Sequence, residues 1–534
     1  MKLFIVESPT KAKTIVRYLG RGWRVEATLG HIKDLPPDNL GVDMESLEPT
    51  FVWVRGKKKL FDRIRELAKK ATFVCIGTDP DREGEAIAYF VREELKRLNI
   101  PIGRVVFYEI TPDSIRQAVE APEEVNTHLV KAQFARRVLD RLIGYRLSPY
   151  LCKATGKLGL SVGRVQSPAL RLVVEREREI IAFKKREYYH IKAVFEKGSV
   201  EFSALWNYRF ERVENAKPYL EKLRRALFEV SLFSEERKEK EPPKPFITSS
   251  LQSVANQRLK MKVEQVQKTA QKLYEQGYIT YPRTDSHRMN QQKAQEFMDY
   301  IKKTYGSNYV GKLRSFPQKS TTQGAHECIR PTGLTTPPLK GGELALYELI
   351  LHRTLASLAS PALLLERRAV LNPLYEGKGR EEMPFMAKGL ELLFDGYLRI
   401  YPEELELSAL PFLQEGEVLK PKKIVVEKRQ TQPPPRYTEG ALVKKLEELG
   451  IGRPSTYATI VKTLKERNYV VEEKGYLKPT EVAFEVVDFL KEKFPGVIDY
   501  SFTNQMEQGL DEVEKGSRDW QELVREFFLS FKVE

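Results

Sequence analysis

Two apolar runs with the length of buried strands, residues 3–6 and 72–76, each lead into acidic side chains. These acidic residues are Glu7 after the first run and Asp79, Asp81 and Glu83 after the second. Since the carboxyl ends of parallel strands lie along one edge of a sheet, we expect the four carboxylates to be neighbours. Clustered carboxylates repel one another unless a cation lies among them, and a hard divalent ion suits oxygen ligands. The pattern predicts a Mg²⁺ site, although Asp-x-Asp pairs also cap helices or lie on surfaces.

Tyr281 stands in a segment that could activate a phenol for attack. A helical pattern over residues 263–274 ends at Gly277, Pro282 ends regular structure after the tyrosine, and Arg283 follows. A tyrosine with its ordinary pKa of about 10 is a poor nucleophile at neutral pH. A neighbouring guanidinium would favour the phenolate and could also bind a phosphate through two N–H groups. A Tyr-x-Arg pair is more often structural, so the residues alone leave both interpretations open.

The charge balance of the chain favours a polyanionic partner. Lys and Arg number 89 against 74 acidic residues, and the net charge is +15. A basic chain of this kind binds nucleic acid or an acidic membrane surface, or is simply soluble. No apolar run approaches the ~18 residues of a membrane span, and the short apolar N-terminus does not fit a signal peptide. We therefore expect a cytoplasmic protein with no membrane partner.

Zinc and ATP are not expected from the motifs. The cysteines are Cys75, Cys152 and Cys328, which lie far apart and form no Cys-x-x-Cys pair. This spacing predicts neither a zinc site nor a disulfide framework. The sequence also has no Gly-x-x-x-x-Gly-Lys-Ser/Thr loop, the motif that cradles the phosphates of ATP. Mg²⁺ is the one cofactor that the chain predicts.

The elements that must position these residues indicate several domains, because 534 residues are too many for one hydrophobic core. Residues 1–125 alternate strand-like and helical runs, which is typical of a parallel sheet, and residues 104–109 read as one of its strands. Helical and basic residues follow. Strand patterns begin near Tyr188 and return after residue 367, so the helical stretch between them predicts a domain inserted into a β-rich one.

The C-terminal part has the outline of a winged-helix unit. Between residues 437 and 479 two helices precede a hairpin, and the hydroxyl of Ser455 or Thr456 would cap the second helix. Such units often bind DNA, but many only pack against their neighbours. The expected fold class is multidomain α/β plus α and β. The expected domains are residues 1–125; residues 126–185 with 431–534; residues 186–241 with 368–430; and residues 242–367.

The motifs resemble a known family when they are taken together. Glu7 followed by Asp79-x-Asp81-x-Glu83 resembles the Toprim domain shared by topoisomerases, primases and some nucleases. The rest of the resemblance is to type IA DNA topoisomerases, closest to the bacterial topoisomerase I branch, and it covers nearly the whole chain. Its segments, which occur in the family's order, are residues 6–13, 81–88, 163–167, 277–286, 325–331 and 452–457.

The resemblance implies a toroidal fold of four domains. Residues 1–125 would be the Toprim domain, and residues 126–185 with 431–534 a helical DNA-binding domain. Residues 186–241 with 368–430 would form a β-rich hinge. The inserted domain, residues 242–367, would carry Tyr281 opposite the acidic cluster. Cysteine-rich zinc ribbons, which follow this core in many relatives, do not occur in the sequence up to Glu534.

The resemblance also implies a reaction. Tyr281 would cut a single-stranded segment of negatively supercoiled DNA and form a 5′-phosphotyrosine. Arg283 and Lys11 would stabilise the phosphate, His326 would order it, and Glu7 would handle the proton of the 3′ oxygen. The metal ligands would be Glu7, Asp79, Asp81 and Glu83. The chain would work as a monomer without ATP, associated with the nucleoid.

A groove for the DNA strand is implied in the same way. The residues at its matching positions are His31, Arg136, Arg137, Asp140, Tyr145, Ser161, Arg164, Gln166, Ser167, Arg283, Arg330, Arg453 and Thr456. Each arginine among them could instead lie on a solvated helix face.

Two other classes of protein share part of this pattern. A Toprim primase or nuclease would use Glu7 and the Asp79/Asp81 pair but would have no use for Tyr281. A non-catalytic DNA-binding protein built on the winged-helix unit would need neither. A covalent adduct between protein and DNA separates both from a topoisomerase. Reverse gyrase is disfavoured, because the chain lacks the phosphate loop of an ATPase.

Overall fold

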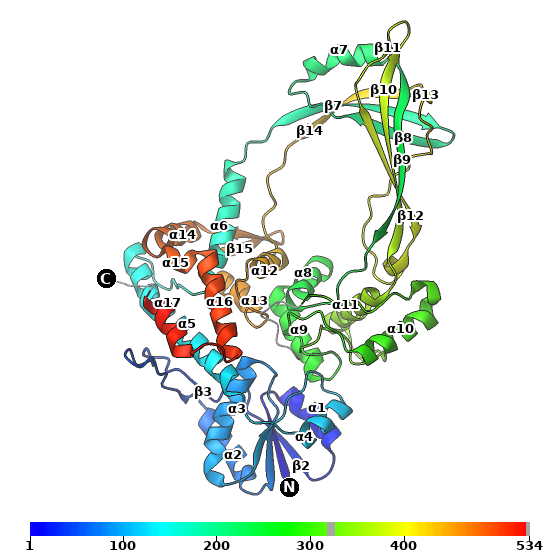
Figure 1. The fold of residues 1–534 in the computed structure, drawn as a ribbon. Coiled ribbons are helices and arrows are strands. Elements are labelled where there is room, and N and C mark those ends of the chain that lie inside the picture. The colour runs from blue at the N-terminus through cyan, green and yellow to red at the C-terminus, as the bar shows by residue number, and fades with distance from the viewer. Residues whose placement is uncertain (318–325, 530–534) are drawn as a thin grey trace.

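The computed structural model describes residues 1–317 and 326–529, and its helices and strands are drawn in Figure 1. The N-terminal unit is a parallel sheet of four strands in the order β2-β1-β5-β6. Because β1 and β5 are neighbours, Glu7 and Asp79 follow adjacent strands at one sheet edge. The strands are β1 (Lys2–Val6), β2 (Trp23–Ala27), β5 (Phe73–Ile76) and β6 (Ile102–Arg104). The helices are α1 (Pro9–Leu19), α2 (Lys57–Ala68), α3 (Arg82–Leu95) and α4 (Pro112–Glu120), with a short hairpin of β3 (Lys33–Asp34) and β4 (Val52–Trp53).

The strand expected over residues 104–109 is wrong, because β6 ends at Arg104. The apolar residues that suggested a strand are buried between the sheet and the inserted helical unit instead. Phe107 and Ile110 are buried in a hydrophobic core that also contains Tyr274 and Ile279 of the inserted helical unit. An apolar run therefore marked burial between two units rather than strand pairing.

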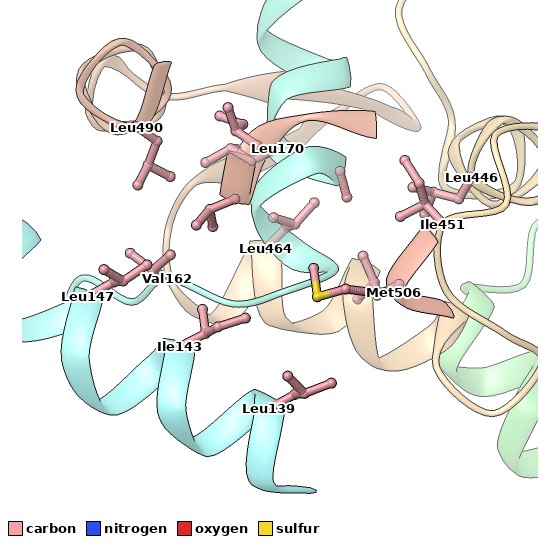
Figure 2. Packing of buried hydrophobic residues seen from close by; sticks show 14 of the residues in the cluster. Leu139, Ile143, Leu147, Val162, Leu170, Leu446, Ile451, Leu464, Leu490 and Met506 are labelled. Atoms are coloured by element: carbon pink, nitrogen blue, oxygen red, sulfur yellow. The ribbon is translucent and has the colours of Figure 1, made fainter. Parts of the chain in front are cut away.

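A second unit combines two stretches that lie far apart in the sequence. Figure 2 shows Leu139, Ile143 and Leu147 of α5 pointing toward residues of α6, α13, α14 and α16 in one hydrophobic core. Thr456 precedes α13, but its hydroxyl bonds the backbone of Arg453 and does not cap the helix as predicted. The first stretch gives α5 (Thr127–Thr155) and α6 (Gln166–Ala182). The second gives α12 (Glu439–Glu448), α13 (Tyr457–Glu466), β15 (Val470–Glu473), β16 (Tyr476–Pro479), α14 (Glu481–Lys493), α15 (Pro495–Ile498), α16 (Tyr500–Glu514) and α17 (Trp520–Leu529).

The third unit is an eight-stranded sheet with the order β13-β9-β10-β12-β8-β7-β14, in which β11 pairs with β10. Its long strands β9 and β10 pair antiparallel over most of their length. The first stretch of chain provides β7 (Glu187–Lys197), β8 (Val200–Trp206), α7 (Val213–Leu223) and β9 (Leu227–Lys240). The second provides β10 (Ala362–Tyr375), β11 (Gly379–Arg380), β12 (Phe385–Phe394), β13 (Val418–Leu419) and β14 (Lys423–Gln430).

A helical unit lies between β9 and β10 in the sequence. Its helices are α8 (Thr248–Leu259), α9 (Val263–Glu275), α10 (Gln291–Tyr305) and α11 (Gly341–Leu358). In Figure 1 the ribbon runs round an opening that is bordered by β7 and β14, by α6, by α8 and α12, and by β9 and β12. The inserted unit closes this ring against the parallel sheet and the second unit. Among the described helices, none is long and apolar enough to cross a membrane.

Candidate active site and nucleic-acid cleft

Tyr281 is held at the junction between the inserted unit and the parallel sheet. After α9, Gly277 adopts a left-handed φ of 84°, and the N–H of Tyr278 turns back to the carbonyl of Leu273. The N–H of Tyr281 then donates to the carbonyl of Tyr108, which follows β6, at 2.8 Å. The tyrosine is almost fully buried, and its hydroxyl donates to Oδ2 of Asp81 at 2.6 Å.

The acidic loop after β5 approaches the first turn of α3 so closely that only glycine fits at position 84. Asp81 caps α3, because its Oδ1 accepts from the N–H of Gly84 at 2.8 Å. A Cβ on Gly84 would lie 2.1 Å from the carbonyl oxygen of Asp79, so the loop and the helix meet at a distance that excludes any side chain. The buried guanidinium of Arg104 donates to that same carbonyl at 3.0 Å. This scaffold sets the directions of the Asp79 and Asp81 side chains.

Lys11 joins the two carboxylates at the ends of β1 and β5. Its fully buried ammonium is 2.6 Å from Oε1 of Glu7 and 2.6 Å from Oδ1 of Asp79. Burial, and then the charge of Asp79, raise the pKa of Glu7 to about 8. Burial would raise the pKa of Asp79 too, but the charge of Lys11, a hydrogen bond with Glu7 and the charge of Arg283 together outweigh it, and the pKa of Asp79 falls well below its usual range. The two carboxylates titrate together, and the pair retains a proton to a higher pH than an isolated carboxyl group would.

Arg283 links the other two carboxylates of the cluster. Its Nη1 is 3.1 Å from Asp81 and 3.3 Å from Glu83, and Glu83 also pairs with Arg136 at 3.0 Å. Burial raises the pKa of Tyr281 well above its usual range, the charges of Asp81 and Asp79 raise it further, and Arg283 opposes them. The phenol is consequently protonated at neutral pH.

His326 lies beside the tyrosine. Its ring is 6.0 Å from the Tyr281 ring and 5.1 Å from the Tyr108 ring, and its Nε2 is 3.1 Å from the carbonyl of Pro80. Burial lowers the pKa of His326, so the imidazole is neutral at pH 7 and donates that hydrogen bond.

The acidic cluster has the donors for a hard cation, but its carboxylates are engaged with lysine and arginine. In the described part of the chain, no group of three or more His, Cys, Asp or Glu side chains is gathered for a metal ion. Oε2 of Glu7, however, is buried without a hydrogen-bond partner. An orphaned carboxylate oxygen next to Asp79 is an open ligand position, so these residues fit Mg²⁺ once the lysine or arginine moves.

A cleft of about 560 Å³ opens between α5, the loop before α6, and α13. Arginine, serine and threonine side chains give it a polar and basic lining. The predicted groove residues that line it are Arg136, Arg137, Asp140, Tyr145, Ser161, Arg164, Gln166 and Thr456.

Five predicted groove residues lie outside this cleft. Arg453 and Arg283 line a neighbouring hollow that also contains His326 and Asp81. Ser167 is buried behind the cleft wall, where its hydroxyl accepts from Gly163. His31 lines a cavity on the far side of Arg136.

Arg330, the fifth of these residues, is buried outside the cleft. It pairs with Glu109 at 3.2 Å and with Glu327 at 2.9 Å. Since Glu109 belongs to the N-terminal unit, Arg330 holds that unit to the inserted one.

Several residues at the site were not foreseen. On α9, Gln271 donates to Oδ2 of Asp79 at 3.0 Å, and Glu275 accepts from Ser8 at 2.6 Å. Their four-residue spacing, which can be seen in the sequence, puts both residues on one helix face. The sequence does not show that this face meets the acidic loop.

On α16, acidic side chains hold arginines of the cleft and of the neighbouring hollow. Glu507 pairs with the buried Arg164, and Asp511 pairs with Arg453 at 2.6 Å and with Arg82 at 2.8 Å. No motif in the sequence connects these distant residues.

Comparisons with known proteins agree with this architecture. A family model described as DNA topoisomerase matches residues 124–525, and a Toprim domain model matches residues 2–110. DNA topoisomerase 1 of Aquifex aeolicus is 56% identical over 528 residues, which cover 99% of this chain and 98% of the relative. DNA topoisomerase 1 of Thermotoga maritima is 41% identical over 546 residues, covering 99% of this chain and 84% of the relative. The solved structure of full-length topoisomerase I from Thermotoga maritima aligns with a TM-score of 0.88 and 40% identity, covering 99% of this chain and 89% of that one.

A Toprim sheet joined to this ring-shaped core defines the fold of a type IA DNA topoisomerase. The chain belongs to the bacterial DNA topoisomerase I family. It is accordingly an isomerase that acts on DNA, and the expected fold class is confirmed.

Proposed function

We propose that the chain relaxes negatively supercoiled DNA by cutting one strand through Tyr281, passing the intact strand, and rejoining the cut without ATP. One observation carries this proposal. The Tyr281 hydroxyl, contributed by the inserted domain, is 2.6 Å from Asp81 in the acidic loop of the Toprim domain. A nucleophile placed between carboxylates and cations suits phosphoryl transfer, and a strand held across two separable domains suits strand passage. The proposal includes four domains: residues 1–125; residues 126–185 with 431–534; residues 186–241 with 368–430; and residues 242–367.

In the proposed reaction the Tyr281 oxygen attacks phosphorus, and the bond from phosphorus to the 3′ oxygen breaks. The protein retains the 5′ phosphate, and the 3′ oxygen leaves as a hydroxyl. The phenolic proton faces Asp81, its nearest acceptor. Glu7, which is protonated at neutral pH, is the group that we assign to the 3′ oxygen. Reversal rejoins the strand, and the covalent bond conserves the energy of the cut.

The remaining site residues bind the phosphate. The buried Lys11 and the half-buried Arg283 would neutralise the charge of the phosphate, while the neutral His326 would orient it. Glu7, Asp79, Asp81 and Glu83 are the residues that we expect to hold Mg²⁺. The ion, when bound, supplies further neutralisation of phosphate oxygens during rejoining.

The proposed substrate is a single-stranded segment of negatively supercoiled DNA bound in the cleft beside α5. Arginines in a cleft of this size suit one strand rather than a duplex, whose groove contacts need a protruding helix or ribbon. We expect a monomer that holds no zinc and works in the cytoplasm on nucleoid DNA.

The proposal is tested by the adduct that it requires. Purified protein is mixed with a single-stranded oligonucleotide and denatured quickly, and the product is resolved by electrophoresis. Label at the 3′ end should travel with the protein, because the enzyme holds the 5′ side of the break, and label at the 5′ end should be released. The opposite pattern would place the chain in another class of topoisomerase.

Tyr281→Phe supplies the decisive variant. It removes one oxygen and little volume, so folding and DNA binding should survive while the adduct and plasmid relaxation fall to background. Tyr278→Phe, three residues away, is the matched control and should retain both. An adduct formed by Tyr281→Phe would move the nucleophile to another residue.

A further inference from the structure

A column of three aromatic rings leads from the core of the β-rich unit to its surface. Phe385 on β12 is fully buried and lies opposite Trp206 on β8. Their rings are nearly parallel, with an angle of 20° and centroids 6.2 Å apart, and the ring of Tyr208 continues the stack at 25° and 5.2 Å from Trp206. Tyr208 is 54% exposed, so this aromatic column ends with an open ring face in solvent. A further planar ring can stack on such a face.

The segment after β8 holds the outer ring in place. Tyr189 and Phe210 exchange two backbone hydrogen bonds of 2.8 and 2.9 Å, and Nδ1 of the buried His190 is 3.0 Å from the carbonyl of Tyr208. The rings of Phe210 and Tyr208 also meet edge to face, with centroids 4.7 Å apart. The stacking surface is therefore ordered in advance, and a ligand would bind without having to order it.

Positive charge without acidic partners surrounds the aromatic column. Arg209 lies over the ring of Tyr188 at 5.0 Å, which joins the loop after β8 to the basic residues before β7. Glu187, the acid next to those residues, pairs with Lys428 at 2.8 Å, so Glu211 is the one acid between the two arginines of the loop that offsets their charge. None of the exposed cations here forms an ion pair with a residue that the structure describes, and they are Lys184, Lys185, Arg186, Arg209 and Arg212.

An exposed stacking surface beside free cations suits single-stranded DNA. A base would extend the aromatic column, while guanidinium groups of the loop would bind the phosphates on either side of that base. A duplex fits less well, because its bases would first have to leave their own stack. A proline-rich peptide can also bind aromatic side chains, but it carries no phosphates for the cations. The combination of rings and positive charge therefore favours a nucleic-acid strand.

The aromatic column lies at the far end of α6 from the cleft. Gln166, the first residue of α6, lines the cleft, and the basic residues before β7 follow the last turn of this helix. Figure 1 shows α6 leading from the second unit to β7 along the border of the ring opening. A helix of 17 residues is about 25 Å long, a distance that takes roughly seven stacked nucleotides at about 3.4 Å each. A strand that fills the cleft and continues beyond it can reach the column.

We propose that the aromatic column and its flanking arginines form a second binding site for single-stranded DNA, outside the cleft. One base of the strand stacks on Tyr208, and Arg209 and Arg212 bind the neighbouring phosphates. The inference rests on the proposed function, because the strand at this site is the continuation of the one held in the cleft. Binding at two places raises the affinity for long strands and keeps the enzyme on its substrate between cuts.

The test compares the affinities of two oligothymidines, measured by fluorescence anisotropy. A strand of about 6 nucleotides is too short to span α6, and one of about 30 nucleotides can reach both sites. Tyr208→Ala should weaken binding of the long strand about tenfold, which is the effect of losing one stacked base, and should leave binding of the short strand unchanged. Tyr208→Phe should bind both strands as the wild type does, because the ring stacks and the hydroxyl is not needed. Phe412→Ala, at an exposed aromatic position elsewhere in the β-rich unit, is the matched control and should also behave as the wild type.

Thermal unfolding shows whether a loss of binding reflects a loss of fold. Because Tyr208 is more than half exposed, Tyr208→Ala should unfold within a few degrees of the wild type. Equal affinity of the wild type and Tyr208→Ala for the long strand would overturn the inference, although the adduct test could still succeed. Absence of any adduct from the wild type would instead overturn the proposed function. If Tyr208→Ala lost affinity for a proline-rich peptide and kept its affinity for the long strand, the column would bind a protein partner and the inference would be wrong.

Discussion

At the active site each carboxylate of the acidic cluster is bound by a cation from a neighbouring element. Lys11 bridges Glu7 and Asp79, and Arg283 bridges Asp81 and Glu83. These pairs reduce the repulsion among four acidic side chains at one sheet edge. They also mean that Mg²⁺ competes with ammonium and guanidinium groups for the same oxygens. The identity of these residues could be predicted from the sequence, but their pairing could not, because Arg283 arrives from 200 residues further along the chain.

The first prediction at this scale concerns the metal. Replacing both Asp79 and Asp81 with Ala should reduce Mg²⁺-dependent relaxation by about a hundredfold, because the ion loses two oxygen ligands. Relaxation of supercoiled plasmid measures the effect, with circular dichroism to verify folding. Asp113→Ala, an exposed change on α4 of the same domain, should leave relaxation intact. Normal relaxation by the double variant, or by the wild type in excess EDTA, would exclude the cluster as the metal site.

The second prediction concerns pH. The pKa of Glu7 is raised to about 8 in the folded protein, so folding takes up a proton between its ordinary pKa and 8. The contribution of Glu7 to the free energy of unfolding is fully present below pH ~4.5. It is lost as pH rises toward 8, by up to about 1.4 kcal/mol per pH unit. Asp79 acts in the opposite sense, since its lowered pKa stabilises the fold above its ordinary pKa and loses this effect in acid.

Glu7→Gln replaces the protonated acid by a neutral amide, so the variant should not lose this stability as pH rises toward 8. Unfolding temperatures of wild type and variant, measured without metal from pH 5 to 9, should diverge as pH rises, with the wild type falling faster. Parallel curves would show that Glu7 is already ionised in the folded protein.

At the scale of elements, periodicity and turn residues predicted α9, its end at Gly277 and the parallel strands before the acidic residues. They failed where an apolar run served a different purpose, as at residues 105–109, which pack between units. Sequence patterns report that a segment is buried, and strand pairing is only one way to bury it. The Thr456 hydroxyl shows a related failure, because a nearer backbone partner at Arg453 competes with the helix end.

Gly277 gives a prediction about how α9 delivers the tyrosine. Its φ is 84°, and a Cβ there would lie 2.4 Å from the carbonyl oxygen of Ile110 in the Toprim domain. Gly277→Ala should therefore cost at least about 1 kcal/mol in stability and should also lower adduct formation, because Tyr281 is four residues away. Gly333→Ala, where the added carbon meets nothing within 4 Å, is the control. Equal unfolding temperatures for the two variants would contradict the close approach.

At the scale of the molecule, the units of the ring are joined by contacts that no local pattern records. Examples are the ion pair of Arg164 with Glu507 and the hydrogen bond of Gln271 with Asp79. Each joins segments that lie far apart in the sequence. The ring-shaped fold and the position of Tyr281 opposite the acidic cluster were predicted from the resemblance to the family. Side-chain chemistry alone predicted only that acidic residues would meet.

The net charge of +15 leads to a prediction for the whole chain. Binding of single-stranded DNA should weaken with salt, with a slope of about −0.7 in log affinity against log salt for each phosphate contacted. Arg137→Ala, in the cleft wall, should reduce the magnitude of the slope by about one contact. Arg224→Ala, an exposed change in the β-rich unit, should leave the slope unchanged. Affinity independent of salt would contradict binding through the cleft.

The hydrophobic core shared by the Toprim domain and the inserted domain has a thermal consequence. Phe107 and Ile110 pack in one cluster with Tyr274 and Ile279, so that swinging the inserted domain away, as the proposed strand passage requires, would expose their apolar surface to water. Hydration of apolar surface raises heat capacity, and an opening step of this kind has an enthalpy that changes with temperature. Opening the ring would therefore cost free energy, and the temperature dependence of turnover would curve wherever opening limits the rate.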